Sequence, residues 1–414
     1  MKRIISIITL VLIFVNVFCG CEKNISDDLM LNITPNNVEK GELSDVDNSS
    51  VTDFAVRLFR SSFESGKNVL ISPLSVLTAL SMTANGADGN TLTQMEATLG
   101  MSVQELNGWI STYIDSLPTE EKYKLSLANS IWFTDEDTFT VNDDFLQTNA
   151  DYYGAGIYRA PFDKSTCRDI NNWVSDNTDG MIKNILDEIP ESAVMYLVNA
   201  LAFDAEWQTI YNTKQIRDNV FTTEDGVSCE AEMMYSEENR YLEDDSATGF
   251  IKYYNDRKYA FVALLPNDGV TVAEYVASLD GEKLFEILDG AEITPVETAI
   301  PKFETEYDVE MSDVLKQMGM TDAFDYATAD FSKLGYSVEG NIKINRVLHK
   351  TYINVDEKGT KAGAATVVEM DGKSALMPDN EPKKVYLDRP FVYMLIDCEN
   401  NIPFFIGTVM NIVS

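Results

Sequence analysis

One residue limits most of the chemistry this chain could perform, because its 414 residues contain a single histidine, His349. That histidine lies inside the strand-like run "NRVLHKTYI", so a nucleophile and base pair built on it would need an unusual site. The sequence has no G-x-S-x-G or H-E-x-x-H motif, no glycine-rich phosphate loop and no calcium-binding loop. Because 67 residues are acidic, chance pairs of carboxylates carry no information. The sequence therefore argues against an enzyme.

Cysteine usage and charge exclude further classes of site. Cys167, Cys229 and Cys398 are scattered without C-x-x-C spacing, so we expect buried thiols, no disulfide framework, no metal site and no cofactor. The formal net charge of −35 at pH 7 repels phosphate backbones and anionic lipid headgroups, and no cluster of Lys and Arg offers a local exception. We therefore expect no nucleic-acid partner.

A segment near the C-terminus that begins with a run of Gly, Ala and Thr could be either a loop or a strand. It is "DEKGTKAGAATVVEMDGKSALMPDNEPKK", residues 356–384. From Thr360 to Gly372 every second residue is uncharged, and the residues between them carry all the charges. This separation fits a strand with one buried face and one wetted face. Glycine and alanine, however, give little intrinsic strand preference. The alternation alone leaves open whether the segment is an exposed loop or a strand.

The elements that must position this segment are both helical and extended. Apolar residues recur at helical spacing in residues 51–64 and 73–87. Runs rich in β-branched and aromatic residues predict strands within residues 124–133, 193–203, 258–266, 341–355, 383–397 and 402–413. No linker or internal repeat divides the chain after Val51. We therefore expect one mixed α+β domain over residues 51–414.

The N-terminus predicts export. A basic start at Lys2 and Arg3 precedes an apolar run that is short for a membrane span, which is typical of a signal peptide over residues 1–20. The following "FCGC" resembles a bacterial lipoprotein cleavage box, in which Cys21 would be lipidated and would anchor the protein through its acyl chains. Residues 21–50 are polar and predict a flexible tether. We expect an exported protein, lipid-anchored to a bacterial outer membrane or cell surface, or fully secreted if cleavage is ordinary.

Several motifs, in the right order along the chain, resemble those of the serpin family of protease inhibitors. "NVDEKGTKAGAAT" is similar to the serpin hinge, "NVLISPLSVLTALSMTANGADGNTLTQM" to an early helix, and "VNALAFDAEW" to the central strand that ends in tryptophan. "IPKF", "DRPFVYMLID" and "PFFIGTVMNI" are similar to later strands, so the resemblance covers about Val51 to Ser414. One departure is "FDAEW", where many members have Lys-Gly between Phe and Trp. It affects the upper end of the sheet and not the hinge.

The resemblance implies a serpin fold, with three β-sheets, eight or nine helices and an exposed reactive-centre loop. A target protease would attack the loop as a substrate, and the hinge side of the cut loop would insert into the largest sheet before water could release the acyl-enzyme. Small uncharged hinge residues favour this insertion. The hinge residues that the resemblance names are Glu357, Gly359, Thr360, Ala362, Ala364, Ala365 and Thr366.

The family's usual loop length, counted from Glu357, places the reactive bond at Lys373–Ser374. A lysine there suits a trypsin-like serine protease, or a cysteine protease of similar preference. Met370, Leu376 or Met377 would present other bonds. The expected molecule is a monomer that binds its target protease and touches the membrane by its lipid anchor only. The alternative is a non-inhibitory serpin that acts as a binding or carrier module.

The resemblance also gives His349 a structural role. In serpins a histidine on this strand helps to hold the large sheet closed through an asparagine on the central strand and serines at the start of the early helix. The matching residues are Asn199, Ser72 and Ser75, and Trp207 would pack near the place where insertion begins. We call the set of Ser72, Ser75, Asn199, His349 and Trp207 the predicted sheet gate.

Overall fold

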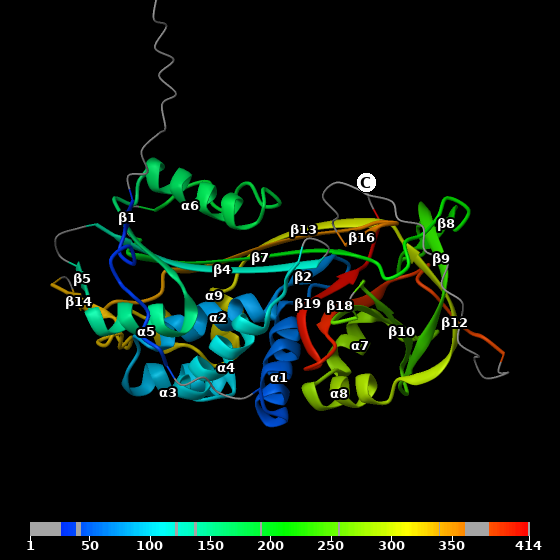
Figure 1. Cartoon of the computed structure of the whole chain (residues 1–414), viewed down its shortest axis with the longest axis horizontal. Coiled ribbons are helices and arrows are strands. Elements are labelled where there is room, and N and C mark those ends of the chain that lie inside the picture. The colour runs from blue at the N-terminus through cyan, green and yellow to red at the C-terminus, as the bar shows by residue number, and fades with distance from the viewer. Residues whose placement is uncertain are drawn as a thin grey trace, which may run out of the picture.

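The molecule is built in layers around one long, twisted sheet, as the computed structural model in Figure 1 shows. Helix α6 (Lys164–Asn177) lies on one face of this sheet, and helices α2 to α5 lie on the other. A second large sheet lies beside the helical layer, at the right of the view. The structure describes residues 26–38, 43–120, 123–135, 139–190, 193–255, 257–338, 340–360 and 381–412. Within these residues the fold is mixed α+β, as the sequence predicted, and its three sheets and nine α-helices agree with what the resemblance implied.

The long sheet has the strand order β1-β6-β4-β7-β16-β15-β13, with β3 paired to β4. Its members are β1 (Asp27–Asp28), β3 (Thr119–Glu120), β4 (Tyr123–Thr134), β6 (Gly156–Ala160), β7 (Met195–Glu206), β13 (Phe303–Glu310), β15 (Arg346–Val355) and β16 (Gly359–Thr360). Strands β4 and β7 are antiparallel along almost their whole length. Strands β7 and β15 run parallel to each other, and β16 lies between them at one end.

The second sheet has the order β17-β12-β9-β10-β11-β18-β19-β2, with β8 also paired to β9. Its members are β2 (Val69–Ile71), β8 (Ile216–Thr222), β9 (Ser228–Glu243), β10 (Ala247–Tyr253), β11 (Tyr259–Pro266), β12 (Glu292–Pro301), β17 (Lys383–Tyr386), β18 (Phe391–Asp397) and β19 (Ile402–Val409). Strands β11, β18 and β19 are buried on both faces, which explains their continuous apolar sequences. A two-stranded sheet joins β5 (Phe139–Val141) to β14 (Gly335–Ser337).

The helices follow the apolar spacing and capping signals of the sequence. Every residue of α2 is buried, because this helix lies between the long sheet and β19. A 3₁₀ helix, η1, covers Asp322–Phe324. The remaining α-helices are α1 (Asp45–Ser62), α2 (Pro73–Ala84), α3 (Gly89–Leu99), α4 (Val103–Ser116), α5 (Asp143–Tyr153), α7 (Val272–Ser278), α8 (Gly281–Asp289) and α9 (Ser312–Gln317).

The domain begins earlier than the sequence indicated. Helix α1 starts at Asp45, because the Ser44 side chain caps it by accepting a hydrogen bond from the backbone N–H of Asp47 at 3.2 Å. The predicted boundary at residue 51 therefore lies inside a helix. Its polar first turn concealed the start, yet Asn48 in that turn is buried and accepts a hydrogen bond from the Trp109 indole.

Part of the predicted tether also belongs to the folded body. Strand β1 pairs with β6, and the Ser26 hydroxyl donates to the Asp169 carboxylate at 2.6 Å. Further along, the Asn36 backbone N–H donates to Asp151 at 2.7 Å. The prediction of a flexible tether over residues 21–50 is therefore wrong for residues 26–38 and for the first turn of α1. The average hydrophobicity of this segment is low, so its composition did not indicate that three apolar side chains pack against the core. They are Leu29, Met30 and Ile33.

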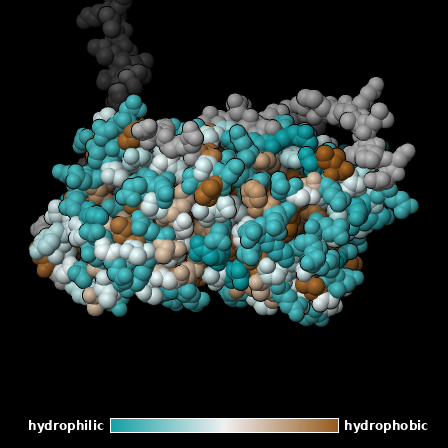
Figure 2. Space-filling view, turned by 90° about the horizontal axis from the view of Figure 1, so that it is seen from below, coloured by the Kyte–Doolittle hydropathy of each residue, from teal (hydrophilic) through white to brown (hydrophobic). Residues whose placement is uncertain are grey.

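The surface is polar over most of the face shown in Figure 2, where apolar residues are scattered among hydrophilic ones. No helix in the described ranges is both long enough and apolar enough to cross a membrane. The described residues also contain no group of three or more His, Cys, Asp or Glu side chains placed to hold a metal ion.

Candidate functional site: the seam of the long sheet

Four of the five residues of the predicted sheet gate meet at one buried point under the long sheet. His349 on β15 accepts, through Nε2, a hydrogen bond from the backbone N–H of Ser72 at 3.0 Å. Its other ring nitrogen, Nδ1, lies 2.6 Å from Oδ1 of Asn199 on β7, and the Ser75 hydroxyl donates to the same oxygen at 3.2 Å. All four residues are at most 1% exposed. The cluster therefore ties β7, β15 and the start of α2 together.

The hydrogen bonds fix the state of the histidine ring. Nε2 accepts from a backbone N–H, so the proton lies on Nδ1, which donates to Asn199. Burial lowers the pKa of His349 from its usual 6.5 to about 3, so the ring is neutral at physiological pH. A neutral histidine held between an amide and a backbone N–H is a structural group. Nothing in this arrangement activates a nucleophile.

The backbone around the cluster explains why these residues meet. Ser72 is the N-cap of α2, and its hydroxyl accepts from the Ser75 backbone N–H at 3.3 Å. Pro73 occupies the first helical position, where its missing N–H costs nothing. The Ser-Pro start thus aims the N-terminus of α2 at the place where β7 and β15 pair directly, with His349 opposite Asn199.

These two strands form a seam that is closed at one end and open at the other. They pair in parallel only over residues 196–199 of β7 and 346–349 of β15. Beyond this stretch they separate, and at the far end β16 fills the gap. Figure 1 shows β16 at this end of the sheet, and the strand order places it between β7 and β15. Between β7 and β15 the long sheet therefore has a place for one more strand, in which the described part of the chain puts two residues, Gly359 and Thr360.

Those two residues are the first part of the predicted hinge. Gly359 lies opposite Glu206 and Thr360 opposite Ala205 on β7, while Thr360 also lies opposite Val355 on β15. Thr360 is 1% exposed, and its hydroxyl is hydrogen bonded to that of Tyr254. The alternation in the sequence assigned Thr360 to the uncharged set, and the structure buries it.

Gly359 is needed for a steric reason. A Cβ at this position would lie 1.9 Å from the carbonyl oxygen of Ala205 on β7. The hinge therefore approaches β7 more closely than any side chain allows. Glycine in the hinge supplies close contact as well as conformational freedom.

Trp207 lies far from the rest of the predicted gate, at the open end of the seam. It is eight positions beyond Asn199, which is about 26 Å along an extended chain. Its indole Nε1 donates to the carbonyl of Asp356 at 2.8 Å, and its backbone N–H donates to the carbonyl of Lys358 at 2.8 Å. The ring stacks on Tyr254 with centroids 4.5 Å apart. Trp207 thus lies apart from the histidine cluster and binds the turn that leads into β16, near the place where insertion was expected to begin.

An ion pair that the sequence did not reveal holds the same turn from the other side. Lys302 Nζ, between β12 and β13, lies 3.0 Å from the Glu357 carboxylate and 3.5 Å from Glu232. Partial burial opposes the charged form of Lys302, but its hydrogen bond to Glu357 outweighs this effect and raises the pKa of Lys302. The lysine lies in the "IPKF" motif, but motif order alone could not indicate which acid it meets.

A second buried charge lies beneath the turn. Lys252 on β10 is 2% exposed, and its Nζ lies 2.7 Å from Oε1 of Glu238 on β9. The ammonium also lies over the rings of Tyr211 at 4.4 Å and Trp207 at 5.4 Å. Burial alone would lower the pKa of Lys252, but Glu238 and Tyr211 outweigh it and raise the pKa. Tyr211 in turn donates its backbone N–H to the Glu357 carbonyl at 2.9 Å.

The remaining predicted site residues lie outside the described residues. They are the hinge residues Ala362, Ala364, Ala365 and Thr366, the reactive-bond residues Lys373 and Ser374, and the lipidation residue Cys21. Their roles stay predictions.

Comparison with known proteins identifies the family. The family model described as "Serpin (serine protease inhibitor)" matches residues 49–412, which is most of the chain. The chain belongs to the serpin family. Serpins in general bind and inhibit proteases and are not themselves enzymes.

Individual serpins match over nearly their whole length. The crystal structure of a thermophilic serpin, tengpin, in the native state superimposes with a TM-score of 0.89 at 47% identity, and covers 94% of this chain and 100% of tengpin. Human Serpin B8 is 30% identical over 368 residues, which span 86% of this chain and 96% of Serpin B8. An uncharacterised serpin-like protein of Thermococcus kodakarensis is 28% identical, over 88% of this chain and 85% of its own length. The seam and the described part of the hinge therefore lie within the region that matches these serpins.

Proposed function

We propose that this serpin is an inhibitor that traps a trypsin-like serine protease, or a cysteine protease of similar preference, by inserting its cut loop into the seam. The observation that carries the proposal is the position of β16. Its two residues already occupy the open end of the strand position between β7 and β15, with Thr360 facing inward. The uncharged residues that alternate after Thr360 match the buried side that further insertion needs.

The chemistry requires one bond to form and one to break. The nucleophile of the protease attacks the carbonyl carbon of Lys373 and forms an acyl bond, while the Lys373–Ser374 peptide bond breaks and the amine of Ser374 leaves with a proton. The hinge side is then free to extend β16 between β7 and β15. A water molecule would complete hydrolysis, so inhibition depends on insertion being faster than this second step.

Insertion has a sufficient driving force. About a dozen new backbone hydrogen bonds at roughly 1 kcal/mol net each would be comparable to the whole stability of a domain. The uncut form is therefore held kinetically, by the closed end of the seam and by the contacts around Asp356 to Thr360.

The export and anchoring signals support a location for this activity. We infer that the chain is exported, that Cys21 carries the lipid, and that the anchored inhibitor faces proteases outside the cytoplasm as a monomer. A Cys21→Ser variant should move from the membrane fraction to the soluble fraction without losing inhibition. Equal partition of the variant and the wild type would contradict the anchor.

Trypsin provides the direct test of trapping. The wild type should form an adduct that survives SDS and releases the C-terminal piece of the chain, and Lys373→Ala should abolish this adduct with trypsin. Thr360→Glu should give cleavage without the adduct, because a carboxylate would enter a site that is 1% exposed. Thr93→Glu, at an exposed position of α3, is the matched control and should trap normally. Normal trapping by Thr360→Glu would refute insertion as the mechanism.

A further inference from the structure

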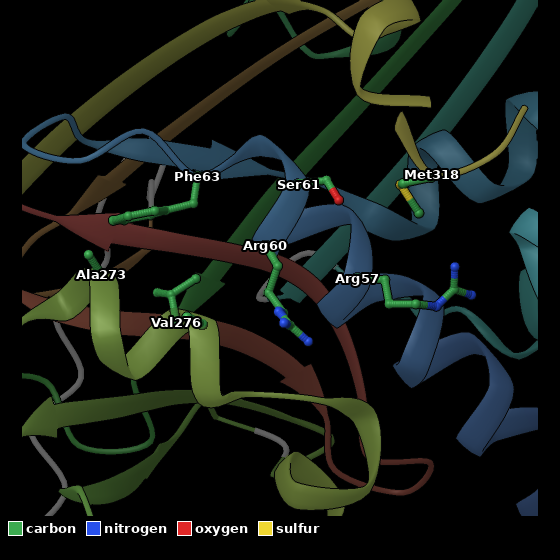
Figure 3. Close-up of a pocket in the computed structure, with 8 residues that line it drawn as sticks. Arg57, Arg60, Ser61, Phe63, Ala273, Val276 and Met318 are labelled. Atoms are coloured by element: carbon green, nitrogen blue, oxygen red, sulfur yellow. The ribbon is translucent and has the colours of Figure 1, made fainter. Parts of the chain in front are cut away.

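A cavity of about 410 Å³ lies away from the seam, between the end of α1, helix α7 and the end of α9. Its walls are mostly apolar, and the close-up in Figure 3 shows Phe63 and Val276 on one side of it and Met318 on another. Ala273 and Ala277 of α7 complete the apolar wall. The volume falls within the range of small-molecule sites in proteins, which are mostly apolar with a few polar groups.

Two arginines of α1 enter the same cavity, and their situations differ. Arg57 is occupied, because its Nε lies 2.6 Å from the Asp53 carboxylate and its Nη2 donates to the Thr98 carbonyl at 3.0 Å. Arg60 is exposed and, among the described residues, makes no hydrogen bond or ion pair. Figure 3 shows its side chain extending from α1 between Val276 on the left and Arg57 on the right. The cavity therefore has one available guanidinium.

What distinguishes Arg60 among the cations of the described residues is its place beside an apolar hollow. Arg60 lies in the last turn of α1, where a positive charge interacts favourably with the helix dipole. That effect explains a basic residue at this position, but it does not explain the apolar hollow next to it. The combination of a single guanidinium and apolar walls matches a ligand with one anionic group and an apolar body.

We propose that this cavity binds a small amphipathic monocarboxylate, with its carboxylate on Arg60 and its apolar body against Phe63, Val276 and Met318. A guanidinium accommodates a carboxylate through two parallel hydrogen bonds. The Ser61 hydroxyl, which also lines the cavity, supplies a further donor. A phosphate dianion fits less well, because the second arginine is already bound to Asp53. This inference is independent of protease trapping, since the cavity shares no residue with the seam or the hinge.

Dodecanoate, used as the probe below its micelle concentration, tests the site by calorimetry on the purified full-length chain. We expect saturable binding of one dodecanoate per chain, and an increase in melting temperature with dodecanoate concentration because the ligand binds only the folded form. Dodecan-1-ol and dodecyltrimethylammonium should bind at least about tenfold more weakly, since they lack the anion. Dodecanol that binds as tightly as dodecanoate would overturn the proposal.

Variants locate the site. Arg60→Gln should weaken dodecanoate binding about tenfold or more, and Arg60→Lys should weaken it less because the charge remains. Lys67→Gln is the matched control, since it removes one positive charge from the exposed segment just beyond α1. Ala273→Trp should fill the cavity and abolish binding, with unchanged circular dichroism as evidence that it folds. Full binding by Ala273→Trp, or an equal loss in Lys67→Gln and Arg60→Gln, would show that the site is elsewhere.

Discussion

The buried pair between Lys252 and Glu238 gives the sharpest prediction about the hinge. The Lys252 side chain is 3% exposed and that of Glu238 is 15% exposed, with Nζ and Oε1 2.7 Å apart. Lys252→Met removes the cation and leaves the Glu238 carboxylate without its partner in a poorly solvated position. Breaking a buried pair in this way costs about 3–5 kcal/mol, against a usual total stability of about 5–15 kcal/mol.

This cost can be converted into a melting temperature. The family match spans residues 49–412, and unfolding entropy is about 2.1 cal/mol/K per residue, so the loss should lower the melting temperature of the uncut protein by about 4–7 °C. Scanning calorimetry at one fixed scan rate measures it. The double variant Lys252→Met with Glu238→Gln should recover most of the loss, because no uncompensated charge is left.

A more exposed pair provides the control. Lys383 lies 3.8 Å from Glu243 with both side chains about half exposed, so Lys383→Met should cost less than about 1 kcal/mol. Hydrogen exchange adds a local measurement: the amides of residues 358–360 should exchange faster in Lys252→Met, since Trp207 and Tyr211 lose the ammonium under their rings. The reasoning fails if Lys252→Met and Lys383→Met lower the melting temperature equally, or if the double variant loses the sum of the single losses.

Three other perturbations have expected outcomes. The pKa of His349 is about 3 in the folded protein and 6.5 in the unfolded chain, so below about pH 6.5 the unfolded state binds more protons than the folded state. The free energy of unfolding should therefore fall by about 1.4 kcal/mol per pH unit as the pH drops below about 5.5. Above pH 7 the ring is neutral in both states, and His349 should have no effect on stability. Urea denaturation of wild type and His349→Gln between pH 4.5 and 7.5 isolates this slope. Gly359→Ala should displace β16 from Ala205, cost about 1–3 kcal/mol and reduce the yield of trypsin adduct on gels, whereas an unchanged yield would contradict the close approach. Lys302→Gln breaks a pair with Glu357 that is partly exposed, so it should cost only about 1 kcal/mol in urea denaturation, and a loss above 3 kcal/mol would refute this ranking.

Sequence reasoning identified elements and motif residues better than it identified contacts. The strand runs and the Ser-Pro helix start were sufficient to bring His349, Asn199, Ser72 and Ser75 into one prediction, and the structure places them together. The alternation assigned Thr360 to the uncharged set, and Thr360 is buried, while the residues after it lie outside the described residues. These features are periodic or local, so they can be recognised along one chain.

Contacts between distant segments were missed. Lys252 appears in the sequence as an ordinary lysine in "FIKYYND", and only the pairing of β9, β10 and the segment after β7 shows that it is buried under aromatic rings. Trp207 was expected near the place where insertion begins, and the structure places it there, but its partners Asp356 and Lys358 could not be read from motif order. The N-terminal segment looked like a tether, since a few apolar residues among many polar ones do not change an average composition.

The closed end of the seam affects how long the uncut form of the protein persists. Residues 196–199 of β7 and 346–349 of β15 already pair with each other. An inserting strand must therefore break these hydrogen bonds before it can form its own with β7 and β15 there. After the loop is cut, the backbone amides of these residues should lose their hydrogen bonds to each other and form new ones to the inserted strand. Substitutions there would change how long the intact molecule survives in storage, while the bond presented to an attacker stays the same. The lifetime of the uncut form and the choice of target protease therefore depend on different segments of the chain.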